Sequence, residues 1–342
     1  MSSLHIDAAP ITLAPIDITA VIPTYNRQEL LPRVLAALIN QKSEGMRHEI
    51  LFADDGSTDN TPAVIDEVVR QYPHIFRYLR LPHTGSPAFP RNQGVREAKG
   101  TVILLLDDDV IPDPTLILEH WKFHRDHPES EAAALGHLYL PEDVKRDPMS
   151  FLHRFREDQI LAADHLNYLF FWSGHVSLKR EFMLNHGMFD ETPVLHPLED
   201  MECGYRLWKS GLRLQYLRAA SGGHAHKMNS ASIPNLGRRL GRAQHALGFK
   251  IPDKYMMRHF HIISDTMGFP GYQIGQIRRA FMFSADNPIT RAIVRLLGGE
   301  KPTRSWVTDL HHYLCFRRNT VAGYKAAVRE SKQNGVGQPV ET

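Results

Sequence analysis

A run of strand-forming residues that ends in three consecutive carboxylates constrains the fold of this chain more than any other feature. Residues 101–106 read Thr-Val-Ile-Leu-Leu-Leu, and Asp107, Asp108 and Asp109 follow directly. Short aliphatic runs rich in Val, Ile and Leu are typical of parallel strands buried on both faces. In an open α/β sheet, ligands bind at the carboxyl ends of the strands. We therefore expect the three acids to lie at the ligand-binding edge of such a sheet.

The three adjacent carboxylates repel one another unless a cation or hydrogen-bond donors compensate them. Side chains two positions apart in a strand point the same way, so Asp107 and Asp109 are expected to face a shared point. Oxygen ligands suit Mg²⁺ or Mn²⁺, which typically also bridge substrate phosphates. The alternative is that the acids cap the following helix. Asp113 and Pro114 already supply an N-cap and first-turn pair for that helix, which favours the metal or nucleotide role.

Strand-like and helix-like segments alternate through the first third of the chain. Strands are predicted over residues 18–22, 49–53 and 76–81, and helices over 28–41, 61–72 and 92–99. This alternation predicts a doubly wound parallel sheet with flanking helices. The loops lack the G-x-G-x-x-G fingerprint and the P-loop sequence, so the pattern does not indicate a dinucleotide-binding protein or a P-loop NTPase.

The charge distribution divides the chain into an acidic part and a basic part. Residues 238–342 carry 17 Lys/Arg and 7 Asp/Glu, whereas residues 1–237 carry 23 and 31. The basic part is therefore expected to meet something anionic. Cys203 and Cys315 are the only cysteines and offer no disulfide framework, which fits a reducing compartment. Because no signal pattern or spanning apolar run appears, we expect a cytoplasmic protein.

Four segments, in their order and spacing, resemble the inverting family-2 glycosyltransferases of the GT-A fold. They are residues 21–27 (VIPTYNR), 53–59 (ADDGSTD), 91–100 (RNQG with Ala98 and Gly100) and 106–109 (LDDD). The resemblance implies a Rossmann-like, mostly parallel central sheet with flanking helices. It also implies a nucleotide pocket, in which Asp55 accepts a hydrogen bond from the base and Arg91 faces the nucleotide or its diphosphate. The residues expected to bind the nucleotide are Pro23, Thr24, Tyr25, Arg27, Asp55, Arg91, Asp107 and Asp108.

The resemblance continues into an acceptor half. Residues 174–180 resemble the family's segment under the donor sugar, with His175 where Asn is usual, and Trp172 could stack on a sugar or be an ordinary buried aromatic. Residues 198–208 resemble the Glu-Asp motif at a helix start. There Asp200 is expected to be the catalytic base, with Glu199 orienting the site, since inverting transfer needs a carboxylate that takes the acceptor proton. The donor and acceptor sugars are assigned to Trp172, Gly174 and His175.

The resemblance also implies the metal ligands. A histidine thirteen positions after a glycine often completes the family's metal site, and His224 follows Gly211 at that distance. The metal ligands are therefore expected to be Asp109, Asp107 and His224, with His226 as the second choice. Mn²⁺ or Mg²⁺ is the expected cofactor.

We divide the chain into a lead-in (1–17), a GT-A catalytic domain (18–230), a mainly α-helical, basic C-terminal region (231–335) and a disordered tail (336–342). The nucleotide-binding half of the catalytic domain covers about 18–110 and the acceptor half about 111–230. The basic region either caps the acceptor site or docks on a membrane surface or an anionic lipid-linked acceptor. No nucleic-acid-binding module is recognisable.

The predicted function is metal-dependent, inverting transfer of a single hexose or N-acetylhexosamine from a nucleotide-diphosphate sugar, with UDP as the expected nucleotide, to an acceptor hydroxyl. Surface polysaccharide, glycolipid or glycoconjugate synthesis would use such a reaction, with a saccharide or lipid-linked acceptor. Two alternatives remain at this point. One is a retaining sugar transferase of the same fold, and the other is a non-catalytic nucleotide-sugar scaffold or sensor.

Overall fold

The computed structural model describes residues 15–145, 160–161, 166–225, 230–251, 292 and 306–334. The strands are β1 Ile18–Thr24, β2 His48–Asp54, β3 Phe76–Arg80, β4 Val102–Leu106, β5 Val110–Pro112, β6 Ala132–Tyr139, β7 His175–Lys179 and β8 Arg213–His224. The helices are α1 Leu31–Ile39, α2 Thr61–Gln71, α3 Ala88–Glu97, α4 Leu116–Asp126, α5 Glu142–Lys145, α7 Arg180–Asn185, α8 Glu199–Lys209, α9 Ile233–Lys250 and α13 Trp306–Gln333, with short 3-10 turns η2 Tyr168–Phe170, η3 Pro193–Leu195 and η4 Ser230–Ser232.

The strands form one eight-stranded mixed sheet in the order β3-β2-β1-β4-β7-β6-β8-β5. Strands β3, β2, β1 and β4 are mutually parallel, as the alternation of strands and helices predicts. Beyond β4 the sheet is mixed, because β7 runs antiparallel to both β4 and β6, while β6 and β8 are parallel. The expectation of a mostly parallel sheet therefore holds for the nucleotide-binding half, and the acceptor half departs from it.

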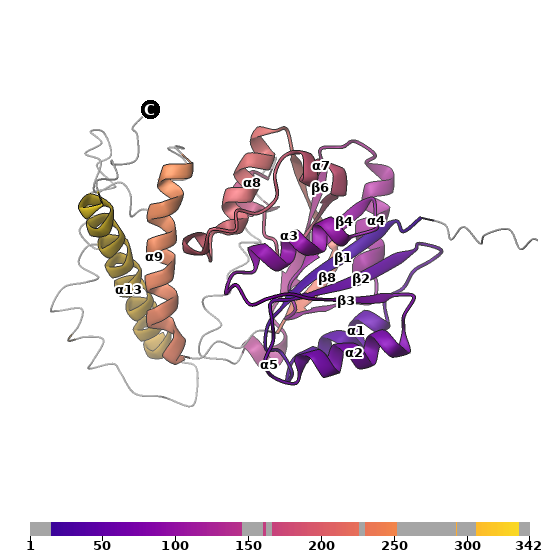
Figure 1. Cartoon of the computed structure of the whole chain (residues 1–342), viewed down its shortest axis with the longest axis horizontal. Helices are drawn as coiled ribbons and strands as arrows, with labels where there is room; N and C mark the ends of the chain where they lie inside the picture. The colour runs from indigo at the N-terminus through magenta and orange to yellow at the C-terminus, as the bar shows by residue number, and fades with distance from the viewer. Residues whose placement is uncertain are drawn as a thin grey trace, which may run out of the picture.

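Two hydrophobic cores lie on the two faces of the sheet (Figure 1). Helices α1, α2 and α4 cover one face, where their buried side chains pack against Ile18, Ile22 and Leu104. Helices α3, α7 and α8 cover the other face and pack against residues such as Ile103 and Val176. Strand residues therefore alternate between two apolar layers. This explains why the sequence of β4 is a continuous aliphatic run.

The start of α4 differs from the sequence prediction. The helix begins at Leu116, and the N-cap position is Thr115. Asp113 lies outside the helix and accepts hydrogen bonds from Tyr139 Oη, at 2.9 Å, and from the hydroxyl of Ser221. The prediction that Asp113 and Pro114 cap this helix is therefore wrong. The short strand β5 pairs with β8 at this point, so Asp113 is used to join the two.

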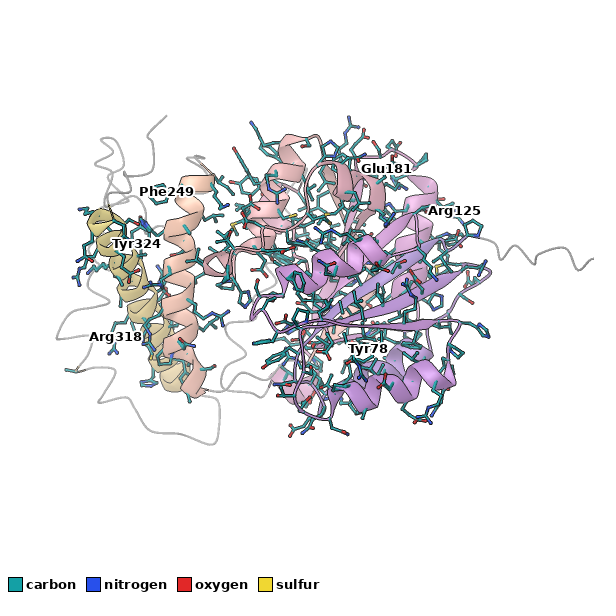
Figure 2. All side chains as sticks on the ribbon, in the orientation of Figure 1. Tyr78, Arg125, Glu181, Phe249, Arg318 and Tyr324 are labelled. Atoms are coloured by element: carbon teal, nitrogen blue, oxygen red, sulfur yellow. The ribbon has the colours of Figure 1, made fainter. Side chains whose placement is uncertain are left out.

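Helices α9 and α13 lie side by side at one end of the molecule (Figure 1). The two backbones approach closely because α9 presents glycines to α13. A Cβ added at Gly241 would lie 2.0 Å from the backbone oxygen of Thr320. His245 lies edge-on to Tyr324 of α13, with ring centroids 5.3 Å apart. Figure 2 shows Phe249 of α9 and Tyr324 of α13 well separated from Tyr78 of β3.

No helix in the described part of the chain combines the length and apolar character needed to cross a bilayer.

Candidate active site

The acid triplet lies where the loops leaving β1, β2 and β4 converge. Asp107 follows β4, and its backbone N–H donates to the carbonyl of Gly174 at 3.1 Å. Gly174 itself packs against the acid, because a Cβ at this position would lie 2.7 Å from Asp107 Oδ2. A glycine is therefore required here for the close approach of the two segments. The triplet occupies the carboxyl edge of the sheet, as predicted from its position after the aliphatic run.

Arg27, at the end of the loop after β1, compensates part of the negative charge. Its Nε donates to Asp108 Oδ1 at 2.9 Å, and Nη2 lies 3.6 Å from Asp109 Oδ2. Burial raises the pKa of both carboxyls to about 7; the neighbouring acids add to this shift, and Arg27 opposes it. One guanidinium therefore does not neutralise the group, and a further cation at this point would stabilise the ionised form.

His224, the last residue of β8, completes this cluster. Its Nε2 lies 3.4 Å from Asp109 Oδ1, and the backbone N–H of the following Ala225 donates to the carbonyl of Asp109 at 2.7 Å. A carboxylate and an imidazole are suitable donors for Mn²⁺. Within the described ranges, however, no three His, Cys, Asp or Glu side chains are arranged to hold a metal ion together. His226 falls outside the described residues.

Arg91, on α3, bridges the triplet to a second pair of acids. Its Nη2 donates to Asp107 Oδ1 at 2.7 Å, and its Nη1 donates to Glu199 Oε1 at 3.0 Å. The guanidinium is buried, and its carbon lies 5.6 Å from the ring centroid of Phe189. The sequence predicts that this arginine faces the nucleotide. In the structure it is held between two carboxylates, which makes it the electrostatic link between the two halves of the site.

The second acid pair begins α8. Glu199 is buried, and its Oε2 lies 3.2 Å from His196 Nδ1. Burial favours a higher pKa for Glu199, but the hydrogen bond from His196 and the charge of Arg91 outweigh it, so the pKa is lowered. The pKa of Asp200 is raised to about 7 by burial and by the charge of Glu199. A carboxyl poised near neutral pH is suited to take a proton.

Three acids at the end of β2 and in the loop after it are held by hydrogen bonds within the protein. Asp54 accepts from Ser57 N at 2.9 Å and from Tyr78 Oη at 2.5 Å. Asp59 accepts from the backbone N–H of Thr61, the first residue of α2, at 2.9 Å. The carboxylate of Asp55 is held by the loop that follows β3, through residues 83–85. Asp54 and Asp59 thus stabilise the turn after β2 and the start of α2.

The remaining nucleotide-site residues lie at the end of β1. Pro23 and Thr24 are the last residues of the strand, and both are buried. Tyr25 follows them and is 39% exposed. Its ring stacks on that of His83, with the ring centroids 4.3 Å apart and an interplanar angle of 18°. An exposed aromatic pair at the mouth of the site provides a surface for a planar ring.

His175 is not in the position that the resemblance implies. The side chain is fully buried on the α4 face of β7, where Nε2 lies 3.0 Å from His120 Nε2. Ser177, two residues along the strand and on the same face, contacts His120 and His124 at 2.8 Å each. Burial lowers the pKa of His175 to about 3, so the ring is neutral. The assignment of His175 to the sugar site is therefore corrected: strand alternation directs it into the core.

Trp172 is partly buried against the core of the acceptor half, and its Nε1 donates to the carbonyl of Leu169 at 3.1 Å. The structure also identifies two site residues that sequence reasoning missed. His196 supports Glu199, and His83 contacts both Tyr25 and Asp55. His196 stands three residues before the Glu-Asp motif, which was an available signal. His83 is distant from Asp55 in sequence, so no local pattern could have indicated the contact.

The sequence of the chain is similar to those of known glycosyltransferases. The sequence model of glycosyl transferase family 2 matches residues 19–186. The uncharacterised glycosyltransferase YfnE of Bacillus subtilis (strain 168) is 25% identical over 266 residues, which cover 64% of this chain and 67% of that protein. In four curated relatives, the part that matches this chain covers between 34% and 67% of the relative's own length.

Solved structures show the same fold. Mannosyltransferase PcManGT from Pyrobaculum calidifontis, in complex with GDP-Man and Mn²⁺, matches with a TM-score of 0.60 at 17% identity, covering 92% of this chain and 88% of that one. S. aureus TarS 1-349 in complex with UDP matches with a TM-score of 0.53 at 18% identity, covering 93% and 92%. Residues 19–186, just under half of the chain, match glycosyl transferase family 2, and the chain adopts the GT-A fold.

Proposed function

We propose that the chain catalyses metal-dependent, inverting transfer of a single sugar from a UDP-sugar to an acceptor hydroxyl. The observation that carries this proposal is the arrangement of two acid clusters around Arg91. One cluster has more carboxylates than Arg27 compensates, and the other holds Asp200 with a pKa raised to about 7. An excess of negative charge suits a metal ion that in turn binds a diphosphate. A carboxyl with a pKa near 7 is suited to take a proton from the acceptor.

Asp107, Asp109 and His224 would hold Mn²⁺ or Mg²⁺. When bound, the metal would neutralise the charge that develops on the departing diphosphate. Support comes from the raised pKa values of Asp108 and Asp109 and from the 3.4 Å approach of His224 to Asp109. PcManGT, a protein of the same fold, was solved with Mn²⁺ and a nucleotide sugar.

The nucleotide would lie along the loop after β1. Pro23, Thr24 and Tyr25 would line the base and ribose, with Arg27 and Asp108 beside the diphosphate. TarS was solved with UDP and PcManGT with GDP-Man, and both nucleotides carry a base with a ring N–H. We retain UDP as the proposed nucleotide. Asp55 is the base contact that the family resemblance implies.

The acceptor would be deprotonated by Asp200. Its position at the first turn of α8 places the carboxyl beside Glu199, and its Oδ1 accepts from the N–H of Met201 at 2.7 Å. Glu199 is held by Arg91 and His196, so its role is to orient the pair and to raise the pKa of Asp200. Trp172 and Gly174, next to Asp107, would border the donor sugar.

The basic C-terminal region contributes a helix pair that extends the acceptor half. Arg238 donates to Asn319 at 2.9 Å and Arg242 pairs with Glu330, so these arginines join α9 to α13. Lys250 pairs with Asp190, close to α8. These contacts favour a cap over a saccharide acceptor. Peripheral docking on a membrane carrying a lipid-linked acceptor is the second possibility for this region.

The function is tested by incubating the protein with UDP-sugars, Mn²⁺ and simple saccharide acceptors, and by reading the anomeric configuration of the product by NMR. Inversion with a metal requirement supports the proposal. Retention of configuration would identify a retaining transferase. Metal-dependent binding of UDP with neither transfer to an acceptor nor hydrolysis of the donor would favour a non-catalytic sensor.

A further inference from the structure

The carboxylate of Asp55 is held by the loop that follows β3. Oδ1 accepts from Thr84 N at 2.9 Å and from Thr84 Oγ1 at 2.8 Å. Oδ2 accepts from Gly85 N at 3.0 Å and lies 2.9 Å from His83 Nδ1. A carboxylate has about four lone-pair sites; three of them accept hydrogen bonds here, and His83 Nδ1 lies beside the remaining one. With a side chain only 6% exposed, Asp55 is screened by this loop from contact with a nucleobase.

His83, by contrast, presents an accessible polar atom. The side chain is 47% exposed, and the ring stacks on Tyr25, the aromatic residue assigned to the base. Nδ1 lies 2.9 Å from both the backbone oxygen and Oδ2 of Asp55. Both are acceptors, so these contacts select the tautomer with the proton on Nδ1, in which Nε2 is an acceptor. Among the described residues, Nε2 has no hydrogen-bond partner.

The loop geometry fixes the position of His83. Gly56 has φ +74°, and a Cβ there would lie 2.8 Å from the backbone nitrogen of His83, so the loops after β2 and β3 are in close contact. Gly85 has φ +73°, and a Cβ there would lie 3.8 Å from Nε2. A glycine at this position keeps the surroundings of Nε2 open. The imidazole is therefore held by Asp55 on one edge and is accessible on the other.

We propose that His83 is the base-selecting residue of the nucleotide site, with Nε2 accepting a hydrogen bond from a ring N–H of the base, and that Asp55 is a positioning residue that orients the imidazole. This proposal rests on the proposed function. The chemistry selects bases that have an N–H at this edge, which are uracil (N3–H) and guanine (N1–H). Cytosine and adenine have a lone pair at the equivalent atom and are disfavoured.

The test compares nucleotide binding by calorimetry in the presence of Mn²⁺. The wild type, His83→Phe and His83→Gln are titrated with UDP, CDP, GDP, N3-methyl-UDP and N1-methyl-GDP. Phenylalanine keeps a ring to stack on Tyr25 but lacks Nε2, whereas glutamine restores an amide oxygen at a similar reach. Because His83 is half exposed, both variants are expected to fold, and their melting temperatures are measured alongside.

We expect the wild type to bind its preferred diphosphate about tenfold more tightly than the ring-methylated analogue, as the loss of one hydrogen bond predicts. This ratio should fall to near one in His83→Phe and recover in part in His83→Gln. An unchanged ratio in His83→Phe, or no discrimination by the wild type, overturns the role of His83 and leaves the proposed function standing. If the wild type binds none of the diphosphates, the proposed function itself fails.

Discussion

The two acid clusters of this protein share one arginine and differ in how their charge is balanced. In the triplet, Asp107, Asp108 and Asp109 face Arg27 and one arm of Arg91. At the start of α8, the other arm of Arg91 satisfies Glu199, and Asp200 is left with a raised pKa. The first cluster therefore has more carboxylates than arginines, whereas the second contains a carboxyl prepared to accept a proton. Similar residues acquire different chemistry because burial and pairing, and not residue type, set their protonation.

The sharpest test of this contrast is Asp200→Asn, which removes the proton acceptor and keeps its shape. We expect transfer to fall by roughly 10²- to 10⁴-fold, the usual contribution of a general base, with donor binding preserved. Steady-state kinetics and calorimetry separate the two effects. Glu202→Gln, on the same helix but paired with Arg206, is the control. Near-normal transfer by Asp200→Asn would show that the second cluster is not catalytic.

Arg91→Lys tests the link between the clusters. Lysine keeps the charge but cannot donate to Asp107 and Glu199 in the same fork geometry. Because a buried carboxylate then loses a partner, we expect nucleotide affinity and transfer both to fall by about 10- to 100-fold. If only one of the two falls, the clusters act independently, and the bridge seen in the structure does not couple them.

Asp109→Asn tests whether the first cluster binds a metal ion. Nucleotide affinity in Mn²⁺ should fall by about tenfold, because a charged ligand is lost, and the difference between Mn²⁺ and chelator should shrink. The same change should raise the melting temperature of the metal-free protein at pH 8. This follows because a carboxyl with a raised pKa destabilises the fold once it ionises. A metal response equal to that of the wild type would contradict the assignment.

The pH profile tests the second cluster without mutation. Asp200 must be ionised to act as a base, and its pKa is raised to about 7. Below that pH, kcat/KM should fall by about tenfold per unit, and above it the rate should reach a plateau. Activity is lost on acidification because only the ionised carboxylate can accept a proton. A flat profile between pH 5 and 8 would show that Asp200 is not the group that titrates.

The smallest effect on transfer is expected from His175→Asn, which introduces the residue usual in the family. The side chain belongs to the buried histidine group under β7 and is outside both acid clusters. We expect a loss of stability of about 1–3 kcal/mol, because His120 loses its partner, and a change in transfer of no more than about threefold. Thermal unfolding and kinetics measure the two. A large loss of transfer at unchanged stability would return His175 to the sugar site.

Much of the fold was predictable because its determinants are local. The aliphatic run of β4 and the strand–loop–helix alternation predict the parallel half, in which β1, β2, β3 and β4 pair as expected. The antiparallel β7, the short β5 and the extension of β8 to His224 were not predicted. Their pairing depends on partners more than 40 residues away, for example Val110 with His224, which periodicity does not report.

The sequence by itself determined which residues are candidates for the chemistry. The triplet stands out by its place after the aliphatic run, and the family resemblance indicates Glu199, Asp200 and His224. Only the tertiary structure decided how they are paired. It places Arg91 between Asp107 and Glu199, His83 against Asp55, and His175 in the core. The physical reason is that protonation and orientation depend on burial and on charges brought together across the sheet, which neighbours in sequence do not specify.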